Sequence, residues 1–268
     1  MTWRAGPLSG TIDQMGTVAA SLTATGAPAC AELTVVRHGE STANAAFAAA
    51  EAAGRAETGL TGRDAGVPLS PRGRAQAAGL GRWLAALPPA RHPEVVLCSP
   101  YRRARQTWQV ARVYAGAAGV TLPVPTIEPR LRDRVTGRLE LLTSAAIAVR
   151  YPEQAARRRA DGELRYRPPG GESLWDVAGR LRTLLPDLDR WFAGRRVLVV
   201  AHDAVVLMLR HLIDGLGEPE LLSAGPVPNG SLTRWRREGH RLVLAEANRV
   251  PPPTVGPVQG RHRRRHQL

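Results

Sequence analysis

Two histidines and two arginines stand at or just beyond the ends of apolar runs in the sequence, and their types suit one kind of chemistry. Arg37 and His38 directly follow one apolar run, Arg103 lies a few residues after a second, and His202 follows a third. A neutral imidazole nitrogen can displace an alkoxide from a phosphate monoester. Such an ester is dianionic, so arginines and a second histidine are needed to neutralise its oxygens. These residues therefore indicate phosphoryl transfer, with His38 as the nucleophile.

The alkoxide that leaves in such a reaction needs a proton, which a carboxylic acid can supply. Attack of water on the resulting phosphohistidine completes a phosphatase cycle. Attack by a hydroxyl of a second substrate would instead make the enzyme a mutase or transferase.

The elements that must position these residues follow from the pattern of apolar runs. Short continuous runs predict buried strands, and amphipathic segments between them predict helices that begin at good N-cap residues. This alternation favours an α/β fold, a three-layer α/β/α sandwich whose mostly parallel central sheet has helices on both faces. Ligands bind at the carboxyl ends of the strands of such sheets. The expected strands are 33–36, 95–98 and 197–200, and the expected helices are 70–87, 102–115, a long helix beginning at 173, and 204–213.

Other segments give the expected domain organisation. Residues 127–133 resemble a short strand, and segments 232–236 and 241–245 a closing hairpin. The arginine-rich stretch 138–169 is interpreted as a small helical insertion over the active site, where substrate choice would reside, and its arginines suit an anionic substrate. The domain is expected to span 32–248, between a disordered leader, 1–31, and a basic disordered tail, 249–268.

Six short motifs occur in a fixed order between about residues 32 and 245. Together they resemble the signature of the histidine phosphatase superfamily, in its branch that resembles cofactor-dependent phosphoglycerate mutases. One departure is Gly66, which stands where an aspartate is usual. The motifs are Arg37-His38-Gly39-Glu40-Ser41 with Asn44, Val67-Pro68-Leu69-Ser70 with Gly73 and Gln76, Ser99-Pro100 with Arg103 and Thr107, Leu131-Arg132-Asp133 with Gly137, Gly170-Gly171-Glu172-Ser173, and His202-Asp203.

The resemblance implies a role for each matching residue of the phosphoryl site. His38 would be phosphorylated, the phosphoryl group would be surrounded by basic side chains, and polar side chains would add hydrogen bonds near it. The basic group comprises Arg37, Arg103 and His202, and the polar residues are Ser41 and Asn44.

The resemblance leaves two candidates for the proton donor. Members like phosphoglycerate mutase use a position that corresponds to Asp133, whereas members like acid phosphatases use one that corresponds to Asp203. The surrounding pattern favours Asp133, although aspartate is one methylene shorter than the usual glutamate. Glu172 is a further candidate for the pocket, and it could equally cap the helix that begins at Ser173.

Composition adds limits on setting and partners. The net charge is +14 and all 37 basic residues are arginine, for which codon bias is a sufficient explanation. Two cysteines without a CxxC motif favour a reducing, cytoplasmic setting. No apolar run approaches the roughly 18 residues of a membrane span. The histidines lack metal-ligand spacing, so no metal or other cofactor is assigned.

The leading hypothesis is a phosphatase that hydrolyses a small phosphorylated substrate. The first alternative is a phosphotransferase of the phosphoglycerate mutase type. The alternative from another class is a non-catalytic binder of a phosphorylated partner or nucleic acid, against which the intact set of basic residues around His38 argues. Nucleic acid and membranes are not expected as partners, and a homodimer is a possible assembly.

Overall fold

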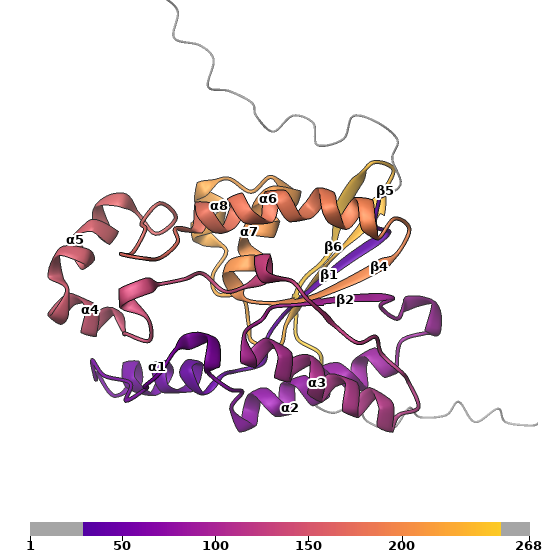
Figure 1. The fold of residues 1–268 in the computed structure, drawn as a ribbon, viewed down its shortest axis with the longest axis horizontal. Coiled ribbons are helices and arrows are strands. Elements are labelled where there is room, and N and C mark those ends of the chain that lie inside the picture. The colour runs from indigo at the N-terminus through magenta and orange to yellow at the C-terminus, as the bar shows by residue number, and fades with distance from the viewer. Residues whose placement is uncertain (1–28, 253–268) are drawn as a thin grey trace, which may run out of the picture.

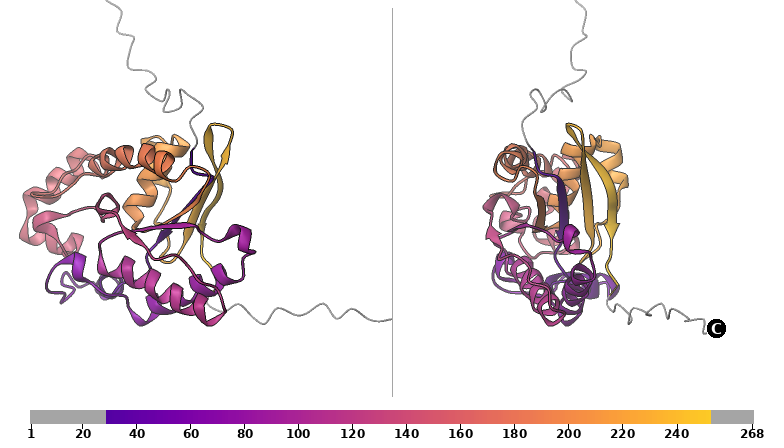
Figure 2. Two further views of the ribbon diagram at one scale, coloured as in Figure 1. Left: turned by 45° about the vertical axis from the view of Figure 1, so that its right-hand side comes forward. Right: turned by 90° about the vertical axis from the view of Figure 1, so that its right-hand side faces the viewer.

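A six-stranded mixed sheet lies at the centre of the protein, in a computed structural model that describes residues 29–252. The strand order is β3-β2-β4-β1-β5-β6. Strand β5 is antiparallel to both of its neighbours, β1 and β6, and the other neighbouring pairs are parallel. Figure 2 shows helices on both faces of this sheet. The predicted three-layer α/β/α architecture with a mostly parallel sheet is therefore confirmed.

The elements follow one another along the chain as Figure 1 shows. The strands are β1 (Glu32–Arg37), β2 (Val95–Cys98), β3 (Thr126–Ile127), β4 (Arg196–Ala201), β5 (Leu232–Glu238) and β6 (Arg241–Arg249). The helices are α1 (Thr42–Ala52), α2 (Pro71–Ala85), α3 (Arg102–Ala117), α4 (Ser144–Arg150), α5 (Pro152–Asp161), α6 (Leu174–Trp191), α7 (Asp203–Asp214) and α8 (Glu218–Ser223). Short 3₁₀ turns occupy Asp64–Gly66, Pro89–Arg91, Pro129–Leu131 and Gly137–Leu139.

The apolar runs of β1, β2 and β4 are continuous because both faces of these strands are covered. One face packs on α6 and α7 through a cluster that includes Leu33, Val35 and Leu181. The other face packs on α2 and α3 through a second cluster that includes Val36 and Trp108. Together the two clusters bury both faces of these strands.

The register of the sheet brings the predicted site residues to one edge. Arg37 at the end of β1 pairs with Ala201 of β4, and Cys98 of β2 pairs with Val200 of β4. The residues that follow these three strands therefore leave the sheet at the same level. This is the convergence that the sequence pattern predicted for His38 and His202.

The segment 138–169, expected as a helical insertion, contains the two helices α4 and α5 and has a small core of its own. Leu139, Ile147 and Tyr166 make a buried cluster that is separate from the two clusters against the sheet. Helices α4 and α5 lie at the left-hand end of the molecule in Figure 1, together with α1. Among the described residues no helix is long and apolar enough to cross a membrane.

Three boundaries differ from expectation. The strand expected at 127–133 comprises only Thr126–Ile127, since Pro129 has no N–H to donate and begins a 3₁₀ turn. Most of the expected leader and tail lies outside the described residues. Of the parts within them, Cys30 is buried in the main core and β6 continues through Arg249, so the folded part is wider than 32–248.

Candidate active site

His38 stands on a turn that is held tightly against the start of α2. A Cβ at Gly39 would lie 2.4 Å from the carbonyl oxygen of Gly73, and a Cβ at Gly73 would lie 1.9 Å from that of Glu40. Only glycine permits this approach at either position. The Gly39 N–H donates to the hydroxyl of Thr107 (3.0 Å), which in turn donates to the carbonyl of Arg103 (2.8 Å). The turn that carries His38 is thus tied to α3, which carries Arg103.

The hydrogen bonds of His38 define its tautomer. Its Nδ1 lies 2.7 Å from the carbonyl oxygen of Gly39, which can only accept, so Nδ1 carries the proton. Its Nε2 accepts from Nε of Arg103 at 3.1 Å. Burial, followed by the charges of His202, Arg103 and Arg37, holds the pKa of His38 well below its usual value. His38 is therefore a neutral imidazole with its lone pair on Nε2.

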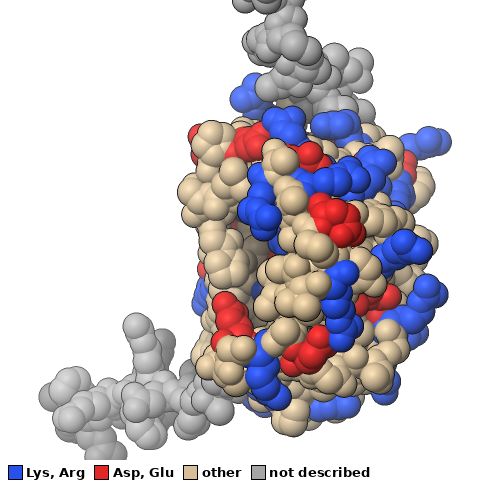
Figure 3. Space-filling view, turned by 90° about the vertical axis from the view of Figure 1, so that its left-hand side faces the viewer, with Lys and Arg blue, Asp and Glu red and all other residues tan. Residues whose placement is uncertain are grey.

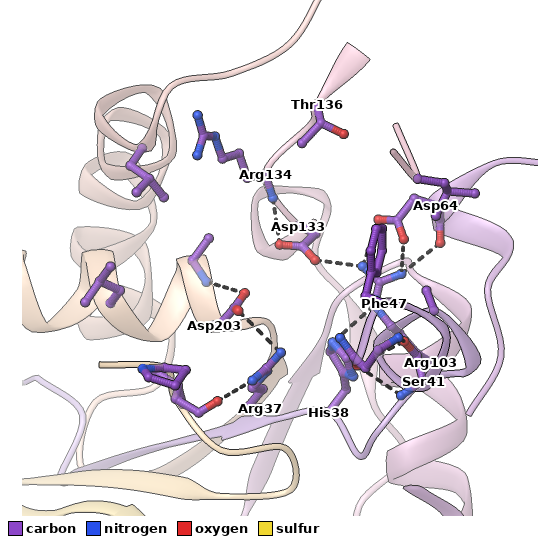
Figure 4. A pocket seen from close by; sticks show the side chains of 18 of the residues that line it. Arg37, His38, Ser41, Phe47, Asp64, Arg103, Asp133, Arg134, Thr136 and Asp203 are labelled. Carbon is purple, nitrogen blue, oxygen red and sulfur yellow. Dashed lines mark hydrogen bonds and ion pairs between the residues drawn. The ribbon is translucent and has the colours of Figure 1, made fainter. Parts of the chain in front are cut away.

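Arg103 is buried, and its guanidinium is shared between two carboxylates. Asp64 accepts from both terminal nitrogens (2.9 and 2.8 Å), and Asp133 accepts from Nη2 (2.7 Å). Figure 4 shows Arg103 with Asp64 on one side and His38 on the other. The carboxylate of Asp64 thus accepts from the same two terminal nitrogens of Arg103 that a phosphate would use.

Arg37 has one nitrogen that no other group satisfies. Its Nη1 donates to the carbonyl of Val227, and its Nη2 lies 3.3 Å from the carboxylate of Asp203. Its Nε is buried and has no hydrogen-bond partner among the described residues. A buried unpaired donor is costly, and an anion oxygen would satisfy it.

His202 and Asp133 also lie close to His38; Asp133 lines the cavity, whereas His202 is fully buried beside it. The Nε2 of His202 lies 2.8 Å from the hydroxyl oxygen of Ser99, and its Nδ1 lies 3.1 Å from Oδ2 of Asp133 without the alignment of a hydrogen bond. The rings of His202 and His38 are 5.0 Å apart. Burial raises the pKa of Asp133, but His202 and Arg103 outweigh burial and hold it well below its usual value. Asp133 is therefore ionised in the free protein.

Ser41 and Asn44, expected to bind phosphate, cap α1. The Ser41 hydroxyl accepts from the Asn44 N–H (3.1 Å), and the Asn44 carboxamide oxygen accepts from the Ser41 N–H (3.0 Å). Both residues line the same cavity as His38. A contact between these side chains and phosphate stays a prediction.

Glu172 does not line the cavity, in contrast to the expected pocket role. Its carboxylate pairs with Arg132 and Arg180 and accepts from the N–H of Val135 (3.1 Å). It thus fixes the segment that carries Asp133. The cap of α6 is likewise made by Ser173 with Asp176, not with Glu172.

A cavity of about 400 Å³ contains His38 and opens at the end of the molecule that carries the insertion. Arg37, Arg103, Asp133 and Asp203 also line it, as Figure 4 shows, but Asp203 is half-exposed. The expected arginines of the insertion do not line it. Figure 3 shows that face with arginines and carboxylates interspersed rather than gathered by sign.

The same residues could in principle hold a cation. Single ligand atoms of His38, Asp133 and His202 lie within 4.8 Å of one another. However, the guanidinium of Arg103 is in contact with both His38 and Asp133, and a metal ion there would face that positive charge. The electrostatics of the site suit an anion better.

Two contacts of the site were not predicted from the sequence. Asp64 lies in a glycine-rich segment without periodicity, so its pairing with Arg103 follows only from the folded loop. Ser99 was recognised as part of a motif, and its position at the end of β2 could have suggested its contact with His202.

The sequence matches a known family over most of its length. Residues 33–250 match the histidine phosphatase superfamily (branch 1), so the chain belongs to that superfamily. The resemblance inferred from the motifs is confirmed.

Two curated relatives represent different activities. The 2,3-bisphosphoglycerate-dependent phosphoglycerate mutase 2 of Gloeobacter violaceus is 35% identical over 192 residues, which cover 67% of this chain and 76% of the relative. The 6-phosphofructo-2-kinase/fructose-2,6-bisphosphatase of Gallus gallus is 30% identical over 184 residues, which cover 68% of this chain and 33% of the relative. This chain thus corresponds to about a third of the chicken protein.

Solved structures of phosphatases share the fold. A mycobacterial glucosyl-3-phosphoglycerate phosphatase in complex with VO3 has a TM-score of 0.62 and 27% identity, covering 81% of this chain and 98% of its own. The alpha-ribazole phosphatase of Shigella flexneri has a TM-score of 0.65 with 22% identity, covering 84% of this chain and 98% of its own, and supports the fold alone.

Proposed function

We propose that this protein hydrolyses a small phosphate monoester through a phosphohistidine intermediate on His38. The observation that carries the proposal is the tautomer of His38. The carbonyl of Gly39 fixes the proton on Nδ1, so Nε2 keeps its lone pair beside Arg103. A neutral nitrogen nucleophile flanked by a guanidinium is the arrangement that attack on a dianionic phosphoryl group requires.

Arg37, Arg103 and His202 would neutralise the phosphoryl oxygens. The unsatisfied Nε of Arg37 would gain a partner when an oxygen binds. The two terminal nitrogens of Arg103 can donate to phosphate as a pair only after their hydrogen bonds to Asp64 break. Binding of substrate therefore includes an exchange of one anion for another at Arg103.

Asp133 is the proposed proton donor. It is ionised in the free protein, but a bound dianionic phosphate would add negative charge beside it and draw away the guanidinium of Arg103. Both changes raise the pKa of a carboxyl group, so Asp133 can take up a proton with the substrate. It would donate that proton to the leaving alkoxide and then accept one from the water that attacks phosphohistidine. Asp203 is less suited, because its side chain is 47% exposed, against 19% for Asp133. It also pairs with Arg37 and not with Arg103, the residue that contacts Nε2 of His38.

A mutase is the second candidate, supported by the relative of 35% identity. It would need groups that hold a second anionic substituent of the substrate. The arginines of the insertion, which could have done so, do not line the cavity. Incubation with 3-phosphoglycerate and its bisphosphate primer tests this alternative, and formation of 2-phosphoglycerate would support it.

The test of the proposal is hydrolysis of p-nitrophenyl phosphate by the wild type and by His38→Ala. We expect turnover by the wild type only, and rapid quenching should trap a phosphoenzyme that is stable to alkali and labile to acid. Equal turnover by both proteins would refute the phosphohistidine mechanism. Ser223→Ala, at an exposed position on α8, serves as the control variant.

The setting of the protein is part of the same proposal. Both cysteines are buried and free, and burial raises the pKa of Cys98 to about 12. Inert thiols are compatible with the cytoplasm, which cell fractionation can test. A homodimer stays a prediction for sedimentation analysis.

A further inference from the structure

We infer that the substrate of this site carries an uncharged, largely apolar alcohol portion, such as an alkyl or arylalkyl group. The inference rests on the proposed function and concerns the part of the cavity beyond the phosphoryl end. It follows from the side chains that line that part, from the partners of the arginines near it, and from the left-handed backbone conformation of one leucine there.

The only arginine that lines the cavity besides Arg37 and Arg103, among the described residues, is Arg134. All three of its nitrogens are engaged: Nε with the carbonyl of Glu172, Nη1 with the carboxylate of Glu163, and Nη2 with the carbonyl of Tyr166, each at 2.8 Å. Arg134 is also largely buried. Three of its five N–H groups are thus occupied, and its charge is already balanced by Glu163.

The arginines of the insertion are turned to other partners. Arg150 pairs with Glu57, Arg165 with Glu218, and both are more than half exposed. The sequence suggested these arginines as receptors for an anionic substrate, but neither lines the cavity. Glu163 also lines the cavity, and its carboxylate pairs with both Arg134 and Arg158. The charged side chains in this part of the cavity are thus already paired with one another.

Apolar side chains from separate elements also line the cavity and form its apolar wall. Phe47 comes from α1, Leu139 and Leu142 from the insertion, and Leu207 from α7. A cavity of about 400 Å³ lined in this way has room for a phosphoryl group together with a short chain or a ring. Apolar atoms of such a substrate would lose contact with water on binding.

Leu141 adds an independent observation. It lines the cavity and has φ = 61°, in the left-handed region that a leucine rarely adopts. The loop is held there by contacts on either side, since the carbonyl of Leu141 accepts from Thr58 (3.5 Å) and Glu140 accepts from the N–H of Asp64 (2.8 Å). Strained non-glycine residues cluster at functional sites, so Leu141 supports a binding role for this part of the cavity.

The experiment compares esters that share a primary alkoxide leaving group, so that intrinsic reactivity is nearly constant. Wild-type kcat/KM is measured for n-hexyl phosphate, ethyl phosphate, glycerol 1-phosphate and 3-phosphoglycerate. We expect hexyl phosphate to exceed ethyl phosphate by at least tenfold, given roughly fourfold per buried methylene group. We expect 3-phosphoglycerate to be the poorest substrate.

A matched pair of variants assigns the preference to the wall. Leu207→Gln should reduce the hexyl-to-ethyl ratio at least fivefold. Leu222→Gln makes the same change at an exposed leucine of α8 and should leave the ratio as in the wild type.

The outcomes separate the inference from the proposed function. Equal use of hexyl and ethyl phosphate, or a preference for 3-phosphoglycerate, would overturn the apolar substrate class while leaving the phosphatase intact. If the wild type hydrolyses none of the esters, binding of hexylphosphonate and ethylphosphonate to His38→Ala by calorimetry still decides the matter. Tighter binding of hexylphosphonate supports the inference, and equal binding refutes it.

Discussion

Removal of the Asp64 carboxylate should make the site bind phosphate more tightly. Asp64 holds both terminal nitrogens of Arg103 at 2.9 and 2.8 Å, and the Arg103 side chain is only 3% exposed. A phosphate that uses Arg103 must displace this carboxylate. Hydrogen bonds to charged groups contribute about 1.5–3 kcal/mol. Recovery of one such interaction corresponds to roughly 10- to 100-fold tighter binding.

The assay is the dissociation constant of orthovanadate or inorganic phosphate, measured by calorimetry or by inhibition of p-nitrophenyl phosphate hydrolysis. Asp64→Ala should show the full increase in affinity. Asp64→Asn should show a smaller one, because the amide oxygen still accepts from Arg103. Glu57→Gln removes one negative charge from the same loop without contacting Arg103, and should leave the affinity within about twofold, since exposed charges interact weakly.

The opposite result would assign Asp64 a different role. If Asp64→Ala binds vanadate several-fold more weakly than the wild type, the carboxylate orients Arg103 for phosphate and does not compete with it. An unchanged dissociation constant would mean that phosphate binds without Arg103, which would refute the reasoning as well.

Three further predictions concern the acid, the turn and the nucleophile. Asp133→Asn should lower kcat for alkyl phosphates by about 10²- to 10⁴-fold, and Asp203→Asn by much less, in steady-state assays; the reverse order would make Asp203 the proton donor. Gly39→Ala should destabilise the protein by about 1–3 kcal/mol, because its Cβ would lie 2.4 Å from a backbone oxygen. A Cβ at Gly179 would meet nothing within 4 Å, so Gly179→Ala should not destabilise the protein. Thermal unfolding of both variants checks this. The pKa of His38 is depressed in the folded protein, so its contribution to stability is present above the unfolded pKa of about 6.5 and is lost as the pH falls towards the folded pKa. Between pH 7.5 and 5.5 the wild type should therefore lose up to about 1.4 kcal/mol more free energy of unfolding than His38→Asn, measured by urea titration. Equal losses in the two proteins would contradict a neutral buried His38.

The sheet and the central residues of the site could be predicted from the sequence because both depend on short-range pattern. Continuous apolar runs required a sheet covered on both faces, and parallel strands brought the residues after them to one edge. His38 and His202 follow β1 and β4 directly, so the register of these strands determines their proximity. The order of the apolar runs was enough to place these two histidines at one edge, and the ordered motifs were needed for their roles.

The remainder of the site depends on loops, whose conformation is set by contacts distant in sequence. Asp64, whose side chain accepts from Arg103, is also held by a hydrogen bond from its N–H to Glu140 of the insertion. Glu172 was expected in the pocket from its neighbours in the chain, yet two arginines draw its carboxylate away from it. Such competition between possible ion pairs is decided by the folded geometry and is not visible in the spacing of residues.

The separate small core of the insertion has a consequence for how this domain can diversify. Leu139 belongs to that core and also to the cavity wall, whereas His38 and His202 are fixed by the sheet. Substitutions that repack Leu139, Ile147 and Tyr166 would reshape the entrance for the alcohol and leave the register of β1 and β4 unaltered. Substitutions in the insertion, whether natural or designed, could thus change which esters fit the cavity without moving His38 and His202.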